Sequence, residues 1–176
     1  MTIALLAPLL LAAGTADVST LDCVAIASKD DYTDETDLCL TAPMAKSVYE
    51  EGMACIGKYQ GTRAMQVRIT DFIIDAKKQE WTDQTAAGDK LAGQIDAMLK
   101  QAKEDPDLDA AAGQAAYDAA RAPLDAASAL GGPEQIKMWQ ADPQMSKRCF
   151  AVMNFFGTNL STRADERARN SDDAGN

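Results

Sequence analysis

Residues 145–160 read MSKRCFAVMNFFGTNL, and their large apolar residues recur at the spacing of an α-helix. Successive members of this apolar face are separated by four, three, four and four positions. They are Met145, Cys149, Val152, Phe156 and Leu160. Just upstream, Asp142 and Pro143 are typical of an N-cap and the first residue of a helix. The stretch therefore predicts a helix with one buried face that carries a cysteine.

The same periodicity extends along most of the chain, and no stretch alternates apolar and polar residues for long enough to predict a strand. Further helices are expected over residues 18–28, 43–79, 107–130 and from Thr82 or Thr85 to 104, with a short turn from Pro133 that carries Ile136 and Trp139. The connections between them are short. The sequence therefore predicts an all-α fold, a single-domain bundle of four to five main helices with up-and-down topology.

Glycine and proline leave some helix boundaries open. Thr41 and Pro43 fit the cap and the first turn of the helix over 43–79, but Gly57 and Gly61 lie inside it. The stretch is either one helix or two helices that break at the glycines. A further possibility is that these glycines let another helix approach closely. Pro123 predicts a kink or a restart within the helix over 107–130.

The first 16 residues resemble a secretory signal peptide. Residues 3–13 form an apolar run of eleven, which fits the core of such a signal and is too short to span a bilayer. Gly14 and Ala16 are small residues at the positions that a signal peptidase reads. No Lys or Arg precedes the run, so either the terminal amine supplies the positive charge or the natural start lies upstream of Met1. A buried N-terminal helix is the alternative.

A signal peptide predicts a periplasmic or secreted protein. The rest of the chain is expected to form a helical bundle that begins with an acidic segment and ends in a tail. An acidic segment over 17–40 contains seven acids and one base, and its residues 29–37 are expected to form a loop. The helical bundle as a whole is expected to cover residues 17–162. From Arg163 onward no apolar residue larger than alanine occurs, which predicts a frayed tail over 163–176.

The four cysteines predict two disulfides, because an exported protein lies in a compartment where disulfides persist. Cys23, Cys39, Cys55 and Cys149 lie at intervals of 16, 16 and 94, without the close pairs of a zinc or redox site. If a helix starts at Pro43, the rise along it makes a bond between the second and third cysteines marginal. Four cysteines allow three pairings, and of the two that remain the sequence favours Cys23 with Cys39 and Cys55 with Cys149 over the crossed arrangement. Free buried thiols are the alternative.

Composition excludes several classes of function. The chain has 176 residues with no histidine, which excludes histidine acid–base catalysis, haem ligation through histidine and the usual zinc sites. A net charge of −10 does not fit nucleic-acid binding. No run after residue 16 is long enough for a transmembrane segment. The 33 alanines leave few large side chains, so the core is expected to be thin.

Three features of the sequence resemble parts of ligand sites, but none of them has a complete binding pattern. The acidic loop over 29–37 lacks the residue order of a calcium-binding EF-hand. The methionines are scattered along apolar faces, which favours core packing over copper binding. Arg63, Arg68 and Lys77 give one region a basic character that would suit a small anion only if these side chains converge. No catalytic residue, metal or cofactor is therefore predicted.

Aromatic residues give the one candidate binding face. Phe150 and Phe155 fall off the apolar face of residues 145–160, so this helix is either buried on several sides or presents a surface to a partner. Trp139 lies close by in sequence and joins them in the candidate face. We expect a binding protein that recognises another protein or the cell envelope. A small-molecule binder and an enzyme that uses only Arg, Lys and carboxylates are the alternatives.

Overall fold

A computed structural model describes residues 18, 21–29, 31–141 and 145–174. Seven α-helices account for most of these residues, and none of the described residues forms a strand. The helices are α1 (Cys23–Ala27), α2 (Asp34–Thr41), α3 (Lys46–Ile69), α4 (Lys78–Glu104), α5 (Ala110–Ala126), α6 (Gly132–Ala141) and α7 (Lys147–Ala174). Short 3-10 helices connect some of them, namely η2 (Thr70–Phe72), η3 (Asp75–Lys77) and η4 (Ala127–Ala129). The all-α prediction is confirmed.

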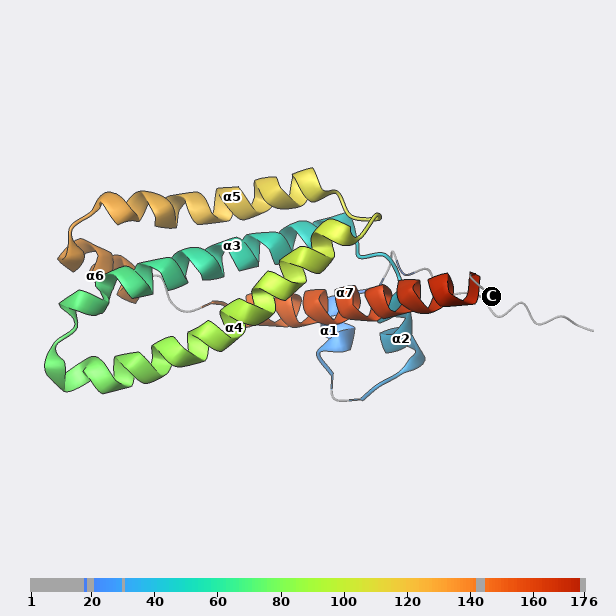
Figure 1. Cartoon of the computed structure of the whole chain (residues 1–176), viewed down its shortest axis with the longest axis horizontal. Coiled ribbons are helices and arrows are strands. Elements are labelled where there is room, and N and C mark those ends of the chain that lie inside the picture. The colour runs from blue at the N-terminus through green and yellow to red at the C-terminus, as the bar shows by residue number, and fades with distance from the viewer. Residues whose placement is uncertain (1–17, 19–20, 30, 142–144, 175–176) are drawn as a thin grey trace, which may run out of the picture.

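The four long helices run along the long axis of the molecule and alternate in direction (Figure 1). α3 packs against α5 and α7, and α7 also contacts α4. The short helices α1 and α2 contact each other and α7. At the opposite end, α6 lies beside the end of α3 and close to the connection between α3 and α4 (Figure 1).

The acidic segment contains a helix where the sequence predicted a loop over 29–37. Thr33 caps α2, and its hydroxyl and that of Thr36 form a reciprocal capping box. The first turn contains three acids, Asp34, Glu35 and Asp37, whose negative charges stabilise the helix by interacting with the positive end of its dipole. Thr41 is the last residue of α2, so it does not cap the next helix, and α3 begins only at Lys46.

α3 is one unbroken helix, because its glycines form the seam with α5. A Cβ on Gly57 would overlap the backbone carbonyl of Tyr117, and one on Gly61 would lie 2.7 Å from the side chain of Leu124. The hypothesis of a close helix approach is therefore confirmed and the break is not. α3 ends at Ile69, and α4 starts at Lys78 rather than at the predicted Thr82 or Thr85.

Pro123 lies inside α5, near its end, and the helix does not restart after it. Because proline has no N–H to donate, α5 lacks the regular hydrogen bond from residue 123 to the carbonyl of Ala119, four residues earlier. Here the chain tightens from α5 into η4 within four residues. The predicted N-cap at Asp142 and Pro143 lies outside the described residues, as does the predicted signal peptide over 1–16.

The apolar interior falls into two clusters, which we name the main core and the tip core. The main core joins α1, α2, α3 and α7 around fully buried Ile56, Phe156 and Leu160. The tip core, at the α6 end, is formed by Met65, Ile69, Trp81, Leu124 and Ala127, with Trp139 packed against it.

Both disulfides lie in or against the main core. Cys23 pairs with Cys39 and joins α1 to α2, and Cys55 pairs with Cys149 and joins α3 to α7. The predicted pairing is therefore confirmed.

α7 continues to Ala174, which corrects the prediction of a frayed tail from Arg163. Arg163 is only 5% exposed and bonds to a buried aspartate, Asp105, in the turn between α4 and α5. Polar contacts with another part of the chain thus hold the segment that lacks apolar anchors. The sequence shows that residues 163–176 lack large apolar side chains, but it does not show that ion pairs take their place.

Candidate functional site

A groove of about 580 Å³ lies between the α1–α2 pair and α7, and we name it the α2–α7 groove. Its apolar lining includes Leu40 and Phe155, which are 7% and 4% exposed. Its polar lining includes Asp31, Tyr32 and Asn154, which are all exposed. The groove is therefore apolar at depth and polar at its mouth, which is the usual character of a binding site.

The polar groups at the mouth differ in how much hydrogen-bonding capacity they retain. The Thr158 hydroxyl donates to the Asn154 backbone carbonyl at 3.0 Å, and the Ser28 hydroxyl donates to the Val24 carbonyl at 2.6 Å. The Asn154 side-chain amide bonds to no other described residue. This amide is the group at the mouth best placed to bond a ligand.

Tyr32 gives the mouth an acidic edge. Its hydroxyl donates to the Asp37 carboxylate at 2.9 Å, and this hydrogen bond, followed by slight burial and the charge of Asp37, raises the pKa of Tyr32. The phenol therefore stays neutral at physiological pH. Lys29 and Asp31 both line the groove, and the first turn of α2 adds Asp34, Glu35 and Asp37 beside it. Four acids therefore outnumber one base around the mouth, and this net negative charge favours a positively charged group in a ligand.

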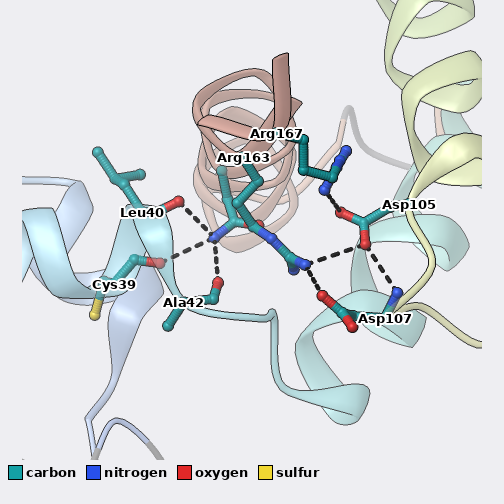
Figure 2. Close-up of polar contacts among 8 residues, drawn as sticks. Cys39, Leu40, Ala42, Asp105, Asp107, Arg163 and Arg167 are labelled. Carbon is teal, nitrogen blue, oxygen red and sulfur yellow. Dashed lines mark hydrogen bonds and ion pairs between the residues drawn. The ribbon is translucent and has the colours of Figure 1, made fainter. Parts of the chain in front are cut away.

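The wall formed by α2 is fixed to α7 by one buried side chain. The Asn159 amide nitrogen lies 3.0 Å from each of the backbone carbonyl oxygens of Cys39, Leu40 and Ala42. These carbonyls belong to the end of α2, where helix carbonyls lack partners within the helix (Figure 2). Together with the Cys23–Cys39 disulfide, this contact makes the wall a preformed part of the groove.

One turn further along α7, an ion cluster holds the α4–α5 turn. Figure 2 shows Arg163 and Arg167 reaching from α7 toward Asp105, whose carboxylate accepts from them at 3.1 and 3.0 Å. Arg163 also bonds to Asp107, and the Asp105 side chain is fully buried. Since these charges are already paired with one another, the cluster acts as a clamp between elements and offers little to a substrate.

The structure separates the three residues of the predicted binding face. Phe155 lines the α2–α7 groove, and Phe150 lies four residues before Asn154 on α7 and is 42% exposed. Phe150 does not line the groove, but residues four apart share a helix face, so it lies on the same side of α7 as Asn154. Trp139 lies in α6 and packs edge-to-face on Trp81, with ring centroids 4.9 Å apart, in the tip core. It therefore belongs to a different region.

The basic residues predicted as an anion site do not converge. Arg63 bonds to Gln66 and Asp89, and Lys77 bonds to Glu80. Arg68 lies 3.4 Å from the carbonyl of Leu124. Each cation thus has its own local partner, so these three residues form no common site.

A second cavity of about 460 Å³ lies between α3, α4 and α5. Met53 and Leu99 give it an apolar lining, and Tyr49 and Lys103 add polar groups. Burial, and then the charges of Asp109 and Asp105, raise the pKa of Tyr49. The buried phenol therefore stays neutral and can donate a hydrogen bond into the cavity.

The α2 side of the groove was not predicted from the sequence, because the acidic residues over 29–37 indicated a loop where α2 forms. The spacing of Thr33 and Thr36 fits a capping box in which threonine stands in the place of the usual Glu or Gln, and could have indicated the helix. The polar contacts of α7 also had a signal, since Asn159, Arg163 and Arg167 recur every four residues and so share one face of the helix. Their partner Asp105 lies far away in sequence, so the pairing itself could not be foreseen.

Comparison with known proteins adds no relative: no family model, no curated protein and no solved structure matches this chain. Within the described part of the chain, no group of three or more Cys, Asp or Glu side chains is placed to hold a metal ion. None of the helices there is long and apolar enough to cross a membrane.

Proposed function

We propose that this chain is an exported binding protein that holds an apolar, positively charged segment of a partner protein in the α2–α7 groove. The observation that carries the proposal is the groove itself: an apolar floor containing Phe155, under a mouth that contains Asp31 and the Tyr32–Asp37 pair. An apolar anchor of the partner would fill the floor, and basic flanking residues would face the carboxylates.

The rigidity of the groove supports binding rather than catalysis. The Cys23–Cys39 disulfide and Asn159 fix the α2 wall before any ligand arrives, so little ordering is required on association. Two disulfides also support export, because such bonds persist in oxidising compartments. The described lining contains no cysteine and no histidine, the side chains that most often serve as a nucleophile or its base.

A designed peptide tests the proposal directly. The probe is a fluorescent helical peptide with leucines on one face and lysines elsewhere, and its control carries glutamates in place of the lysines. Fluorescence anisotropy should show binding of the lysine peptide that weakens at high salt. Equal binding of both peptides would contradict the charge preference.

Variants then locate the site. Phe150→Asp and Asn154→Arg change exposed residues of α7, so both proteins should fold, and each should weaken peptide binding about tenfold or more. Phe72→Asp is the matched control, because Phe72 is an exposed phenylalanine far from the groove. If the control variant loses as much binding as Phe150→Asp, the groove is not the site.

The cavity beside Tyr49 favours a second candidate function, the binding of a small apolar molecule with one hydrogen-bond acceptor. Its volume is in the range of small-molecule sites. An apolar fluorescent dye should bind there, and Leu99→Trp should abolish the signal by filling the cavity. Unchanged dye binding in this variant would exclude the cavity as the site.

A further inference from the structure

Exposed apolar side chains gather at the end of the molecule opposite the groove. Six large apolar side chains in the described residues are at least 42% exposed, and two of them, Tyr32 and Phe150, belong to the groove region. The others are Val67, Phe72, Ile74 and Leu130. We name Phe72, Ile74 and Leu130 the tip surface; they are 54%, 69% and 42% exposed.

The tip surface projects from two neighbouring connections. Phe72 and Ile74 lie between α3 and α4, and Leu130 lies between α5 and α6. The Phe72 ring covers Gly132, where an added Cβ would lie 2.7 Å from ring carbons, so the two connections touch. The Trp81 indole donates to the Thr70 hydroxyl at 3.0 Å and fixes the first connection to the tip core. These side chains are thus held outward by a packed base.

Charge is distributed unevenly along the long axis. Residues 66–80 carry three bases and three acids, and residues 121–140 carry two of each, so the tip end is neutral. In the described part of residues 21–41, at the groove end, five acids face one base. Lys77 and Lys78 stand beside the tip surface with side chains 65% and 60% exposed. An anionic surface would therefore repel the groove end and tolerate the tip.

We propose that the tip surface inserts into the interface of a phospholipid bilayer, with the long axis pointing away from it and the groove presented outward. The exposed apolar side chains would enter the headgroup region. Lys77 and Lys78 are paired with Glu80 and Asp75 in exposed ion pairs, and they would exchange these carboxylates for lipid phosphates at the membrane surface. A second copy is the less suitable occupant, because three partly exposed side chains offer on the order of 300 Å² against roughly 800 Å² per partner in a standard interface.

Flotation with vesicles of phosphatidylethanolamine and phosphatidylglycerol tests the proposal on the full mature chain. Wild-type protein should float with the vesicles, and Phe72→Ser and Ile74→Ser should each weaken partitioning about tenfold. Phe150→Ser is the matched control, since it removes an exposed phenylalanine from the groove end and should leave partitioning unchanged. Ile74 is the more exposed residue, so its variant covers the case in which Phe72→Ser fails to fold.

A depth measurement separates insertion from loose adsorption. Phe72→Trp should be quenched by brominated lipid well beyond the level of Phe150→Trp, because both variants keep the same native tryptophans. Absence of wild-type flotation, or equal losses in Phe72→Ser and Phe150→Ser, would overturn the proposal. So would sedimentation in the absence of vesicles that shows a dimer which Phe72→Ser dissociates. None of these results depends on peptide binding in the groove.

Discussion

Each disulfide has one cysteine in the main core and one packed against it, and the buried ion clamp lies beside this core, whereas no disulfide or buried ion pair of the described residues lies in the tip core. The tip core is held by aromatic contact between Trp81 and Trp139 and by a few aliphatic side chains. The difference teaches how an alanine-rich chain with few large residues can stay folded. Covalent and ionic links fix the groove end, while apolar contacts and neutral hydrogen bonds such as that between Trp81 and Thr70 support the tip.

The largest expected effect comes from opening the longer disulfide. Cys55→Ala/Cys149→Ala removes a cross-link that spans 94 residues, which should cost about 4–5 kcal/mol in the free energy of unfolding. For a chain of this size the melting temperature should fall by more than about 10 °C, and full reduction should lower it further. Calorimetry measures this change. A shift of only a few degrees would mean that the main core does not need its cross-link.

The ion clamp should give the next largest effect. Arg163→Met leaves the Asp105 carboxylate buried with one fewer cation, so the free energy of unfolding should fall by about 3 kcal/mol. Arg148→Met is the matched control, because its pair with Glu51 is exposed and should contribute under about 1 kcal/mol. Urea denaturation compares the two variants. Equal losses would show that the clamp adds no more than a surface pair.

The seam between α3 and α5 connects both cores. A substitution in it should have an intermediate effect on the free energy of unfolding. Gly57→Ala places a methyl group against the Tyr117 backbone, which cannot swing aside, and should cost about 1–3 kcal/mol. Gly93→Ala meets nothing within 4 Å, so its effect should be a stabilisation of up to about 1 kcal/mol from helix propensity. Urea denaturation with a gain in stability for Gly57→Ala would contradict the close seam.

Alkaline pH should produce the smallest effect and should act on one core first. Folding raises the pKa of Tyr49, mainly through burial, so this residue contributes stability that is complete below pH about 10 and is lost as pH rises through its folded value. None of the described tip-core residues is a tyrosine. Tyrosinate absorbance should therefore rise before the fluorescence of Trp81 and Trp139 changes. Tyr49→Phe should delay the loss, and a simultaneous change of both signals would contradict the order.

Local patterns predicted the helices to different extents. The periodicity of residues 145–160 predicted the core of α7, and the C-terminal limit of α4 before Pro106 was also correct. The acidic run over 29–37 suggested a loop, because neighbouring carboxylates repel one another. In α2 this repulsion is offset by the helix dipole and by the capping box. α7 extends past residue 162 for a reason that lies in another segment, namely Asp105.

The candidate site was predicted only in part. Phe150 and Phe155 were predicted as binding residues because they lie off the apolar face of residues 145–160. The structure places Phe155 in the groove. Sequence proximity also pointed to Trp139, which lies in α6 and packs against the tip core instead. The wall that contains Tyr32 and Leu40 comes from a segment more than one hundred residues away, so no local pattern could join it to α7.

By itself, the sequence determined the all-α class, favoured the disulfide pairing that forms and offered the close approach at Gly57 and Gly61 as one alternative, because each depends on spacing along a helix or on the reach of the chain. Only the tertiary structure decided that Asn159 and Arg163 bind distant backbone and carboxylate groups, and that the exposed apolar residues divide between the groove and the tip. Those features depend on which faces meet across the bundle, and burial of a polar group is stable only where a partner from another element completes its hydrogen bonds.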